Sequence, residues 1–359
     1  MYRKIMGFLE AWKDSVHRKP LILQGTRQVG KTYSILEFGR THYENVAYFN
    51  FETNPKLNET FAENISPDYL IPILSHIAGQ TIVKEKTLVV FDEVQLCERA
   101  LTSLKYFCED APEYHIIVAG SLLGVAVNRA KFSFPVGKVD MKTMYPMDME
   151  EFMLALGAND LVEQIKKCFH TDTPLPSALH DAAMQLYRQY LVVGGMPECV
   201  MQFAETKDYI LVRHTQDTIL ASYLNDMSKY NNLNEIKKTR LAYDNITVQL
   251  SKKNTRFQYK LLKKGGRASE FENAIEWLCL SGIVSQVYKV EQIKKPLENY
   301  RDIDAFKIYV SDLGLLCAKK DLAANDILYM VEEINDFKGG MAENYVNVQL
   351  TINGYRTYY

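Results

Sequence analysis

The chain has 359 residues, of which 47% are hydrophobic and 24% charged; this composition indicates a globular protein with a sizeable core and excludes wholesale disorder. The length favours two or three domains. A net charge of −2 excludes bulk attraction to nucleic acid or membrane, so any such affinity would need a local patch.

The six cysteines form no C-x-x-C pair, and no histidine pair complements them, which argues against a zinc site. Free thiols in a reducing compartment are the simpler interpretation. Neither a signal peptide nor a run of about 18 apolar residues is present. We therefore expect a soluble, cytoplasmic protein without a membrane partner.

Apolar runs bounded by turn residues recur through the first 150 residues, which we expect to form one domain. They cover residues 21–25, 46–51, 87–93, 115–121 and 139–145. The segments between them are long enough for helices. Nearly continuous apolar strands that alternate with helices are typical of a parallel sheet covered on both faces. The fold class predicted for this region is therefore α/β.

A glycine-rich loop follows the first of these strands and fits the pattern G-x-x-x-x-G-K-[ST]. Its glycines allow backbone angles that turn the loop's N–H groups toward phosphate oxygens. Lys31 should reach the β- and γ-phosphates, and Thr32 should ligate magnesium. A chance match on a glycine turn is the alternative. The predicted nucleotide-binding residues are Gly25, Thr26, Arg27, Gln28, Val29, Gly30, Lys31 and Thr32.

Two carboxylates end the third strand, at the carboxyl edge of the sheet where ligands bind. Asp92 is the expected direct or indirect partner of Mg²⁺, and Glu93 the expected base for the attacking water. The alternative is a strand that ends at a solvated acidic turn. Ser121, after the fourth strand, would sense the γ-phosphate or cap the next segment. Gln95 is a further candidate.

No guanine-recognition motif is present, so adenine is the expected base. An arginine finger cannot be assigned from spacing. Arg27, Arg129 and Lys138 are the cations close to the site in sequence, and each could instead be solvated.

Beyond Pro146 the pattern changes from strand-like to helical. Residues 147–230 have helical periodicity, interrupted by a proline-containing break and by a turn at Gly194 and Gly195. Residues 231–310 read as helices followed by two short strands, at 283–290 and 306–310. Helices closed by a β-hairpin suggest a winged-helix module. A helix and the start of a strand are expected within residues 340–359.

Residues 237–267 contain ten basic residues and one acidic residue, Asp244, with Phe257 and Tyr259 interleaved. Such a strip is a plausible footprint for a phosphate backbone, and DNA is the candidate partner. A solvated face, or a surface that docks on the acidic remainder of the chain, is the alternative. The candidate nucleic-acid contacts are Lys252, Lys253, Arg256, Lys260, Lys263, Lys264 and Arg267.

The order of these motifs resembles a bacterial and archaeal family of AAA-superfamily ATPases whose function is poorly known. In that family a P-loop ATPase domain precedes a winged-helix region and a restriction-endonuclease-like domain. The resemblance spans most of the chain. Its matching blocks are residues 25–32, 91–95, 119–124, 133–138, 145–152, 193–198, 249–254, 307–316 and 342–346.

The resemblance implies ATP as the nucleotide and a sheet in which the fourth strand lies between the first and the third. It also implies four regions: an ATPase domain at 1–150, a helical region at 151–230, a winged-helix-like region at 231–318 and the start of a truncated nuclease-like domain at 319–359. Two departures stand out. Lys138 replaces an arginine common in relatives, and only Glu343 of the nuclease-type acidic residues is present.

Three functions remain open at this stage. The first is an ATPase motor or switch that hydrolyses ATP with Mg²⁺ and acts on a nucleic-acid or protein partner. The second is a nucleotide-gated binding module with little turnover. The third is a DNA-tethered regulator that works through the basic segment. A homo-oligomer is a candidate assembly, since relatives in the superfamily often form rings.

Overall fold

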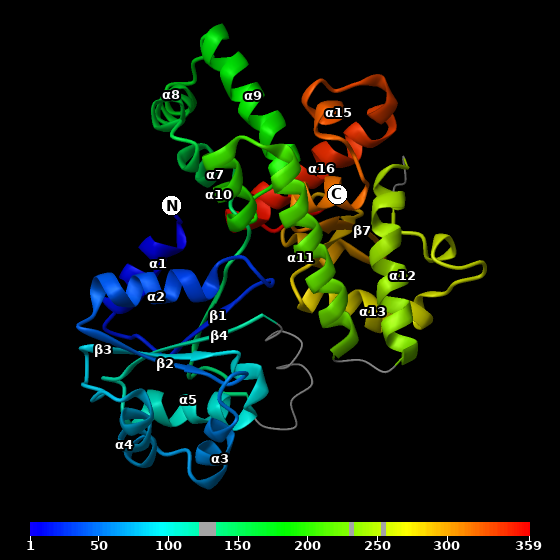
Figure 1. Cartoon of the computed structure of the whole chain (residues 1–359). Coiled ribbons are helices and arrows are strands. Elements are labelled where there is room, and N and C mark those ends of the chain that lie inside the picture. Colours follow the sequence, from blue (N-terminus) through cyan, green and yellow to red (C-terminus); the bar gives the residue numbers. More distant parts are fainter. Residues whose placement is uncertain (122–133, 230–232, 253–255) are drawn as a thin grey trace. The chain divides into compact units, whose positions relative to one another are not determined.

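The structure, a computed structural model, describes residues 1–121, 134–229, 233–252 and 256–359, and these form two compact units (Figure 1). The N-terminal unit comprises residues 3–145. The C-terminal unit comprises residues 146–359 together with Met1 and Tyr2. None of the helices in these described ranges has the length and apolar character needed to span a membrane.

A five-stranded sheet forms the centre of the N-terminal unit, and all its neighbouring strands are parallel. The strand order is β2-β3-β4-β1-β5, so the fourth strand lies between the first and the third, as the resemblance implied. The strands are β1 (Leu21–Gln24), β2 (Asn45–Asn50), β3 (Thr87–Asp92), β4 (His115–Gly120) and β5 (Asp140–Thr143).

Helices cover both faces of this sheet, and the predicted α/β class is confirmed (Figure 1). One face carries α2, and α1 packs on α2. The other face shares a continuous hydrophobic core with α3, α4 and α5. Every residue of β3 and β4 is buried because these inner strands are covered on both sides. The helices are α1 (Ile5–Lys13), α2 (Lys31–His42), α3 (Lys56–Glu63), α4 (Pro67–Ala78) and α5 (Glu98–Asp110).

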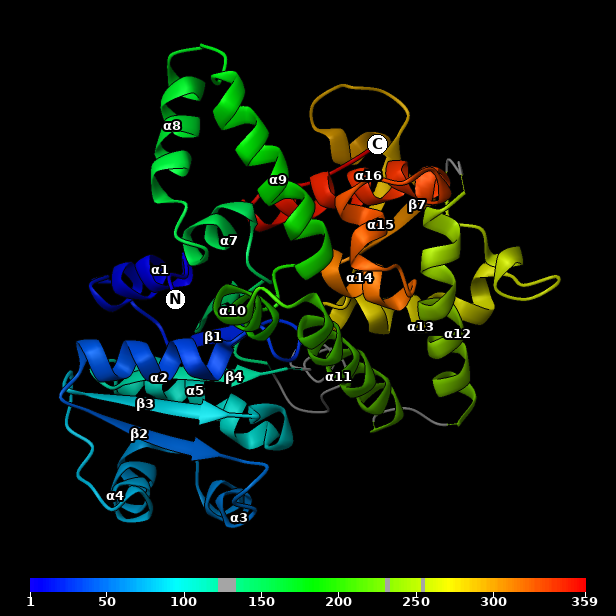
Figure 2. The ribbon, with the colours of Figure 1, turned by 45° about the horizontal axis from the view of Figure 1, so that its top comes forward.

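The first part of the C-terminal unit is helical, as its periodicity predicted. Its first helix begins at a capping box, in which Asp148 accepts from the backbone of Glu151 and the Glu151 side chain accepts from the backbone of Asp148. The helices are α7 (Met149–Ala155), α8 (Asn159–His170), α9 (Ser177–Val193), α10 (Pro197–Thr206), α11 (Tyr209–Lys229) and α12 (Leu233–Leu250). Figure 2 shows α8 and α9 side by side as a hairpin.

The predicted turn between α9 and α10 is held by a buried carboxylate from far along the chain. Asp312 accepts hydrogen bonds from the backbone N–H of Gly195, at 2.6 Å, and of Leu315, at 2.9 Å. A Cβ on Gly194 would lie 2.2 Å from the Asp312 carboxylate, and the φ of +75° at Gly194 also favours glycine. Burial raises the pKa of Asp312 to about 6.

The last part of the C-terminal unit packs helices around an antiparallel strand pair, β6 (Val284–Val290) and β7 (Arg301–Val310). On α16 the Asn344 side chain accepts from the Val310 N–H and donates to the Val310 carbonyl, both at 2.8 Å. The remaining helices are α13 (Ala268–Leu280), α14 (Leu313–Lys319), α15 (Ala324–Leu328) and α16 (Asn335–Ile352), with short 3₁₀ turns at Val94–Leu96, Tyr259–Leu261, Leu297–Tyr300 and Glu332–Ile334.

The second strand of this pair is longer than its apolar run predicted. It begins at Arg301, because beyond an irregularity at Tyr288 and Lys289 the charged start of β7 still pairs with β6. Near the end of the described chain, Tyr358 forms a parallel bridge with Tyr288. Helices followed by two strands are therefore present, while the winged-helix and nuclease-like assignments remain predictions.

Candidate nucleotide site

The glycine-rich loop between β1 and α2 curls because several of its residues have a positive φ. The values are +151° at Gly25, +65° at Gln28 and +88° at Gly30. A Cβ on Gly25 would lie 2.1 Å from the carbonyl oxygen of Met144, so no larger residue fits without a backbone shift. The loop conformation thus depends on its glycines, as the motif required.

A buried arginine outside the motif holds this loop in place. Arg3 donates from Nη1 to the carbonyl of Val29, at 3.0 Å, and from Nη2 to the carbonyl of Tyr145, at 2.8 Å. Its side chain is almost wholly buried. Arg3 is not among the residues predicted from the sequence, because it lies 26 residues before Val29 and belongs to no recognisable pattern.

The lysine of the glycine-rich motif lies folded over the loop itself. Lys31 Nζ donates to the carbonyl oxygens of Gly25 and Thr26, both at 2.8 Å. Lys31 is also the first residue of α2, whose N-terminus has no side-chain cap. The Thr26 hydroxyl is buried without a hydrogen-bond partner in the described part of the chain. The loop therefore presents an ammonium group, a helix N-terminus and a free hydroxyl in one place.

Asp92, at the end of β3, lies beside the start of α2. Its Oδ2 accepts from the hydroxyl of Thr32, at 2.8 Å, and from the hydroxyl of Tyr48, at 2.7 Å. Its Oδ1 accepts from the Glu93 N–H, at 3.0 Å. Thr32 and Asp92 are 60 residues apart in sequence, and the sheet topology brings them together. Tyr48 is not among the site residues predicted from the sequence.

Glu93 adopts a left-handed backbone conformation, with φ +52°, which is uncommon for a residue with a side chain. Gln95 donates from Nε2 to the Glu93 carboxylate, and its own Oε1 is buried without a partner among the described residues. The two side chains thus form one polar group directly after β3. Ser121 is buried directly after β4, which neighbours β3 in the sheet.

Of the three cations considered as arginine fingers, the structure describes Lys138 and Arg27. Lys138 forms an ion pair with Glu109, with the nitrogen and oxygen 2.8 Å apart. Arg27 lies in the loop and is half-buried. Arg129, and the segment that Ser121 would cap, lie outside the described residues.

The basic segment, residues 237–267, differs from the nucleotide site in that most of its cations are exposed. Lys252, Arg256, Lys260, Lys263, Lys264 and Arg267 are all exposed. Within the described ranges none of these six side chains forms an ion pair, whereas Lys238 and Arg240, earlier in the segment, have partners in Glu235 and Ser228. Lys253 lies outside the described residues.

Phe257, one of the two aromatic residues interleaved with these cations, is not part of a surface platform. Phe257 is buried and stacks on Phe306, with ring centroids 5.6 Å apart. The expectation that aromatics are interleaved with the surface cations is therefore wrong for Phe257, which fills the core behind the strand pair. The reason is its register: its backbone N–H donates to the Phe306 carbonyl, at 2.6 Å.

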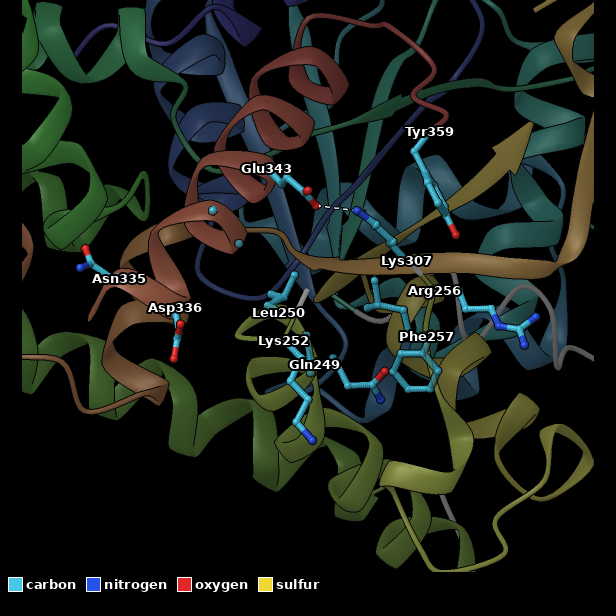
Figure 3. Close-up of a pocket in the computed structure, with 14 residues that line it drawn as sticks. Gln249, Leu250, Lys252, Arg256, Phe257, Lys307, Asn335, Asp336, Glu343 and Tyr359 are labelled. Atoms are coloured by element: carbon cyan, nitrogen blue, oxygen red, sulfur yellow. Dashed lines mark hydrogen bonds and ion pairs between the residues drawn. The ribbon is translucent and has the colours of Figure 1, made fainter. Parts of the chain in front are cut away.

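Lys252 and Arg256 flank a cavity of about 400 Å³ in the C-terminal unit. Figure 3 shows both side chains directed away from Glu343, while Lys307 reaches toward it. Lys307 Nζ lies 2.8 Å from the Glu343 carboxylate, so its charge is already paired. The cations of the cavity therefore do not converge on one point.

Comparisons with known proteins agree with the geometry of the N-terminal unit. Residues 17–153 match the model of a family described as an AAA domain, and residues 184–326 match a domain of unknown function. A search of curated protein sequences found no match.

Three solved structures are among those to which this chain is similar. The Aeropyrum pernix ORC2 protein, in ADPNP–ADP complexes, has 13% identity and a TM-score of 0.44 over 95% of each chain. The Thermotoga maritima RuvB Holliday junction branch migration motor has 14% identity and a TM-score of 0.35, over 79% of this chain and 87% of its own. Caenorhabditis elegans PCH-2 has 11% identity and a TM-score of 0.33, over 57% of this chain and 63% of its own.

Likenesses at these TM-scores carry no functional argument, and this chain spans less than two thirds of the PCH-2 chain. The family match is independent of them. It covers the sheet, the glycine-rich loop and the acidic strand. Residues 17–153, which hold the candidate nucleotide site, are therefore similar to an AAA domain.

Proposed function

We propose that this chain binds ATP together with Mg²⁺ and hydrolyses it, as a motor or switch that acts on a partner. The observation that carries the proposal is the 2.8 Å hydrogen bond between Thr32 Oγ1 and Asp92 Oδ2. It unites the last residue of the glycine-rich loop with the carboxylate of the acidic strand, which is the pairing that phosphoryl transfer requires at a P-loop.

The loop supplies the groups that would hold the phosphates. The Lys31 ammonium, now bound to two loop carbonyls, lies where it can exchange those contacts for β- and γ-phosphate oxygens. The uncapped N-terminus of α2 contributes N–H donors and a partial positive charge. The unpartnered Thr26 hydroxyl is a further donor available to the ligand.

The protein oxygens at the site suit Mg²⁺, which prefers one or two carboxylate or hydroxyl ligands and completes its shell with waters and substrate phosphates. Thr32 and Asp92 provide such a set. Among the described residues no group of three or more histidine, cysteine or acidic side chains could hold a metal by itself. Bound there, Mg²⁺ would neutralise charge on the β- and γ-phosphates.

The residues after β3 would handle the attacking water. Glu93 is the group that would accept its proton or orient it, and Gln95 fixes the Glu93 carboxylate through a hydrogen bond. The buried Ser121, on the neighbouring strand end, is the candidate that contacts the γ-phosphate.

A second function is supported by the exposed basic residues. Six cations without ion pairs in the described ranges are suited to a phosphate backbone, because their charge is not neutralised within the chain. We infer that DNA contacts this surface, either as the partner of the ATPase or as the main ligand of a regulator with little turnover.

Phosphate release and calorimetry separate these possibilities. We expect wild-type protein to bind Mg-ATP and release phosphate, and Glu93→Gln to bind equally well while turnover falls by about a hundredfold. Equal, very slow turnover in both proteins would favour the nucleotide-gated module. No heat of binding with Mg-ATP would refute the proposal. Turnover measured with and without DNA, at two salt concentrations, tests whether the basic surface is coupled to it.

A further inference from the structure

A chain of hydrogen bonds extends from the Mg²⁺-binding carboxylate into the neighbouring strand. Asn50 Nδ2 donates to the Tyr48 hydroxyl oxygen, at 3.2 Å, and Tyr48 donates to Asp92 Oδ2, at 2.7 Å. Asn50 and Asp92 are register partners in β2 and β3. Tyr48 lies two residues earlier on β2, so its side chain leaves the strand on the same face as that of Asn50.

The direction of these hydrogen bonds is fixed by the backbone. Asn50 Oδ1 accepts from the N–H groups of Glu52, at 2.8 Å, and Thr53, at 3.0 Å. The Asn50 amide nitrogen must therefore face Tyr48. Because the nitrogen can only donate, the Tyr48 oxygen accepts there and its own hydrogen is directed to Asp92.

The Tyr48 side chain is 37% exposed, and its hydroxyl is directed at the Asp92 carboxylate. A protonated phenol is a permanent donor toward a carboxylate. The carboxylate of Asp92 is itself nearly inaccessible to solvent, so it depends on such donors in place of water.

We propose that Tyr48, oriented by Asn50, is a positioning residue that holds the Asp92 carboxylate in the rotamer that binds the metal, and so sets the Mg²⁺ affinity of the site. This inference rests on the proposed function. Oδ1 is held by the Glu93 N–H, and Oδ2 is shared by Thr32 and Tyr48. If Thr32 turns its oxygen toward the metal, Tyr48 is the side chain that continues to fix the carboxylate.

The test is Tyr48→Phe, which removes one hydroxyl and keeps the ring. Calorimetry would measure binding of a non-hydrolysable ATP analogue at a series of Mg²⁺ concentrations and in EDTA. We expect the Mg²⁺ concentration that gives half-maximal enhancement of binding to rise by about tenfold, while the affinity in EDTA stays unchanged. Saturating Mg²⁺ should restore turnover to the wild-type level, because the chemical groups themselves remain.

Tyr106→Phe is the matched control. Tyr106 is a half-buried tyrosine on α5 of the same unit. The donors to Asp92 are Thr32, Tyr48 and the Glu93 N–H, so removal of the Tyr106 hydroxyl should leave the Mg²⁺ dependence unchanged. The melting temperatures of both variants show that they fold.

Two outcomes would overturn the inference while leaving the ATPase proposal in place. One is a Mg²⁺ dependence of Tyr48→Phe that equals that of wild type. The other is an equal loss of affinity with and without Mg²⁺, which would mark Tyr48 as a purely structural residue. Failure of the wild-type protein to bind Mg-ATP would remove the proposed function, and this inference with it.

Discussion

The two units of this chain each bury a carboxylate, and the two carboxylates are satisfied in different ways. Asp92 accepts from two side-chain hydroxyls and one backbone N–H. Asp312 accepts from backbone N–H groups, which join the turn after α9 to the start of α14. Both are at most 5% exposed.

The difference lies in which donors can change partners. A hydroxyl can rotate and offer its oxygen to a metal, so the surroundings of Asp92 can rearrange around a ligand. A backbone N–H within a turn or a helix has no such freedom, so the surroundings of Asp312 only stabilise the fold. Of these two buried carboxylates, the one with side-chain donors lies at the candidate nucleotide site.

The largest expected difference between the two sites appears when each carboxylate is removed. We expect Asp312→Ala to lower the free energy of unfolding by about 4 kcal/mol, because several buried N–H groups lose their acceptor and α14 loses its cap. Asp92→Ala should change stability by less, about 1 kcal/mol, yet abolish the Mg²⁺ dependence of nucleotide binding. Urea unfolding and calorimetry measure the two effects. Equal destabilisation by both variants would contradict the distinction.

The pH dependence of stability is a second test of how Asp312 differs from Asp92. The pKa of Asp312 is raised from 3.8 to about 6 in the folded protein. The protonated Asp312 carboxyl therefore adds to the free energy of unfolding below pH 4, and this contribution is lost as the pH rises through 6. Between pH 4 and pH 7 we expect wild type to lose about 3 kcal/mol of stability relative to Asp312→Asn. Parallel stability curves for the two proteins would show that burial does not govern this group.

The loop lysine tests whether the surroundings of Asp92 form a working site. Lys31→Ala should weaken nucleotide binding by about a hundredfold, or about 2.7 kcal/mol, because it removes the ammonium group that lies over the loop. Fluorescence titration with a labelled nucleotide measures this loss. Lys84→Ala, at an exposed lysine paired with Glu113, is the control and should bind normally. A small effect at Lys31 would mean that the phosphates bind elsewhere.

The smallest expected effect concerns the exposed cations of the basic segment. Reversing two of them, in Lys263→Glu/Lys264→Glu, should lower DNA affinity by about tenfold and reduce its salt dependence by about two ion equivalents. The matched reversal Lys84→Glu/Lys86→Glu, at two lysines already paired with Glu113 and Glu44, should have little effect. Titrations at two salt concentrations measure both. Equal losses would show that net charge alone matters.

The sequence alone predicted most of the N-terminal unit. The five strands, the loop of residues 25–32 and the carboxylates after β3 are contiguous patterns, and the structure places each at the expected point of a parallel sheet. Such patterns are predictable because apolar runs, glycine conformations and strand ends are properties of neighbouring residues. The helical start of the C-terminal unit followed from periodicity in the same way.

Which distant side chains contact these segments could be learned from the tertiary structure alone. Arg3 on the loop, Tyr48 on Asp92 and Asp312 on Gly195 join residues 26, 44 and 117 positions apart. Phe257, expected among surface cations, is buried against Phe306. A hydrogen bond or ring contact between distant residues has no local signature, because its partners are chosen by how strands and helices pack, and that packing depends on the whole chain.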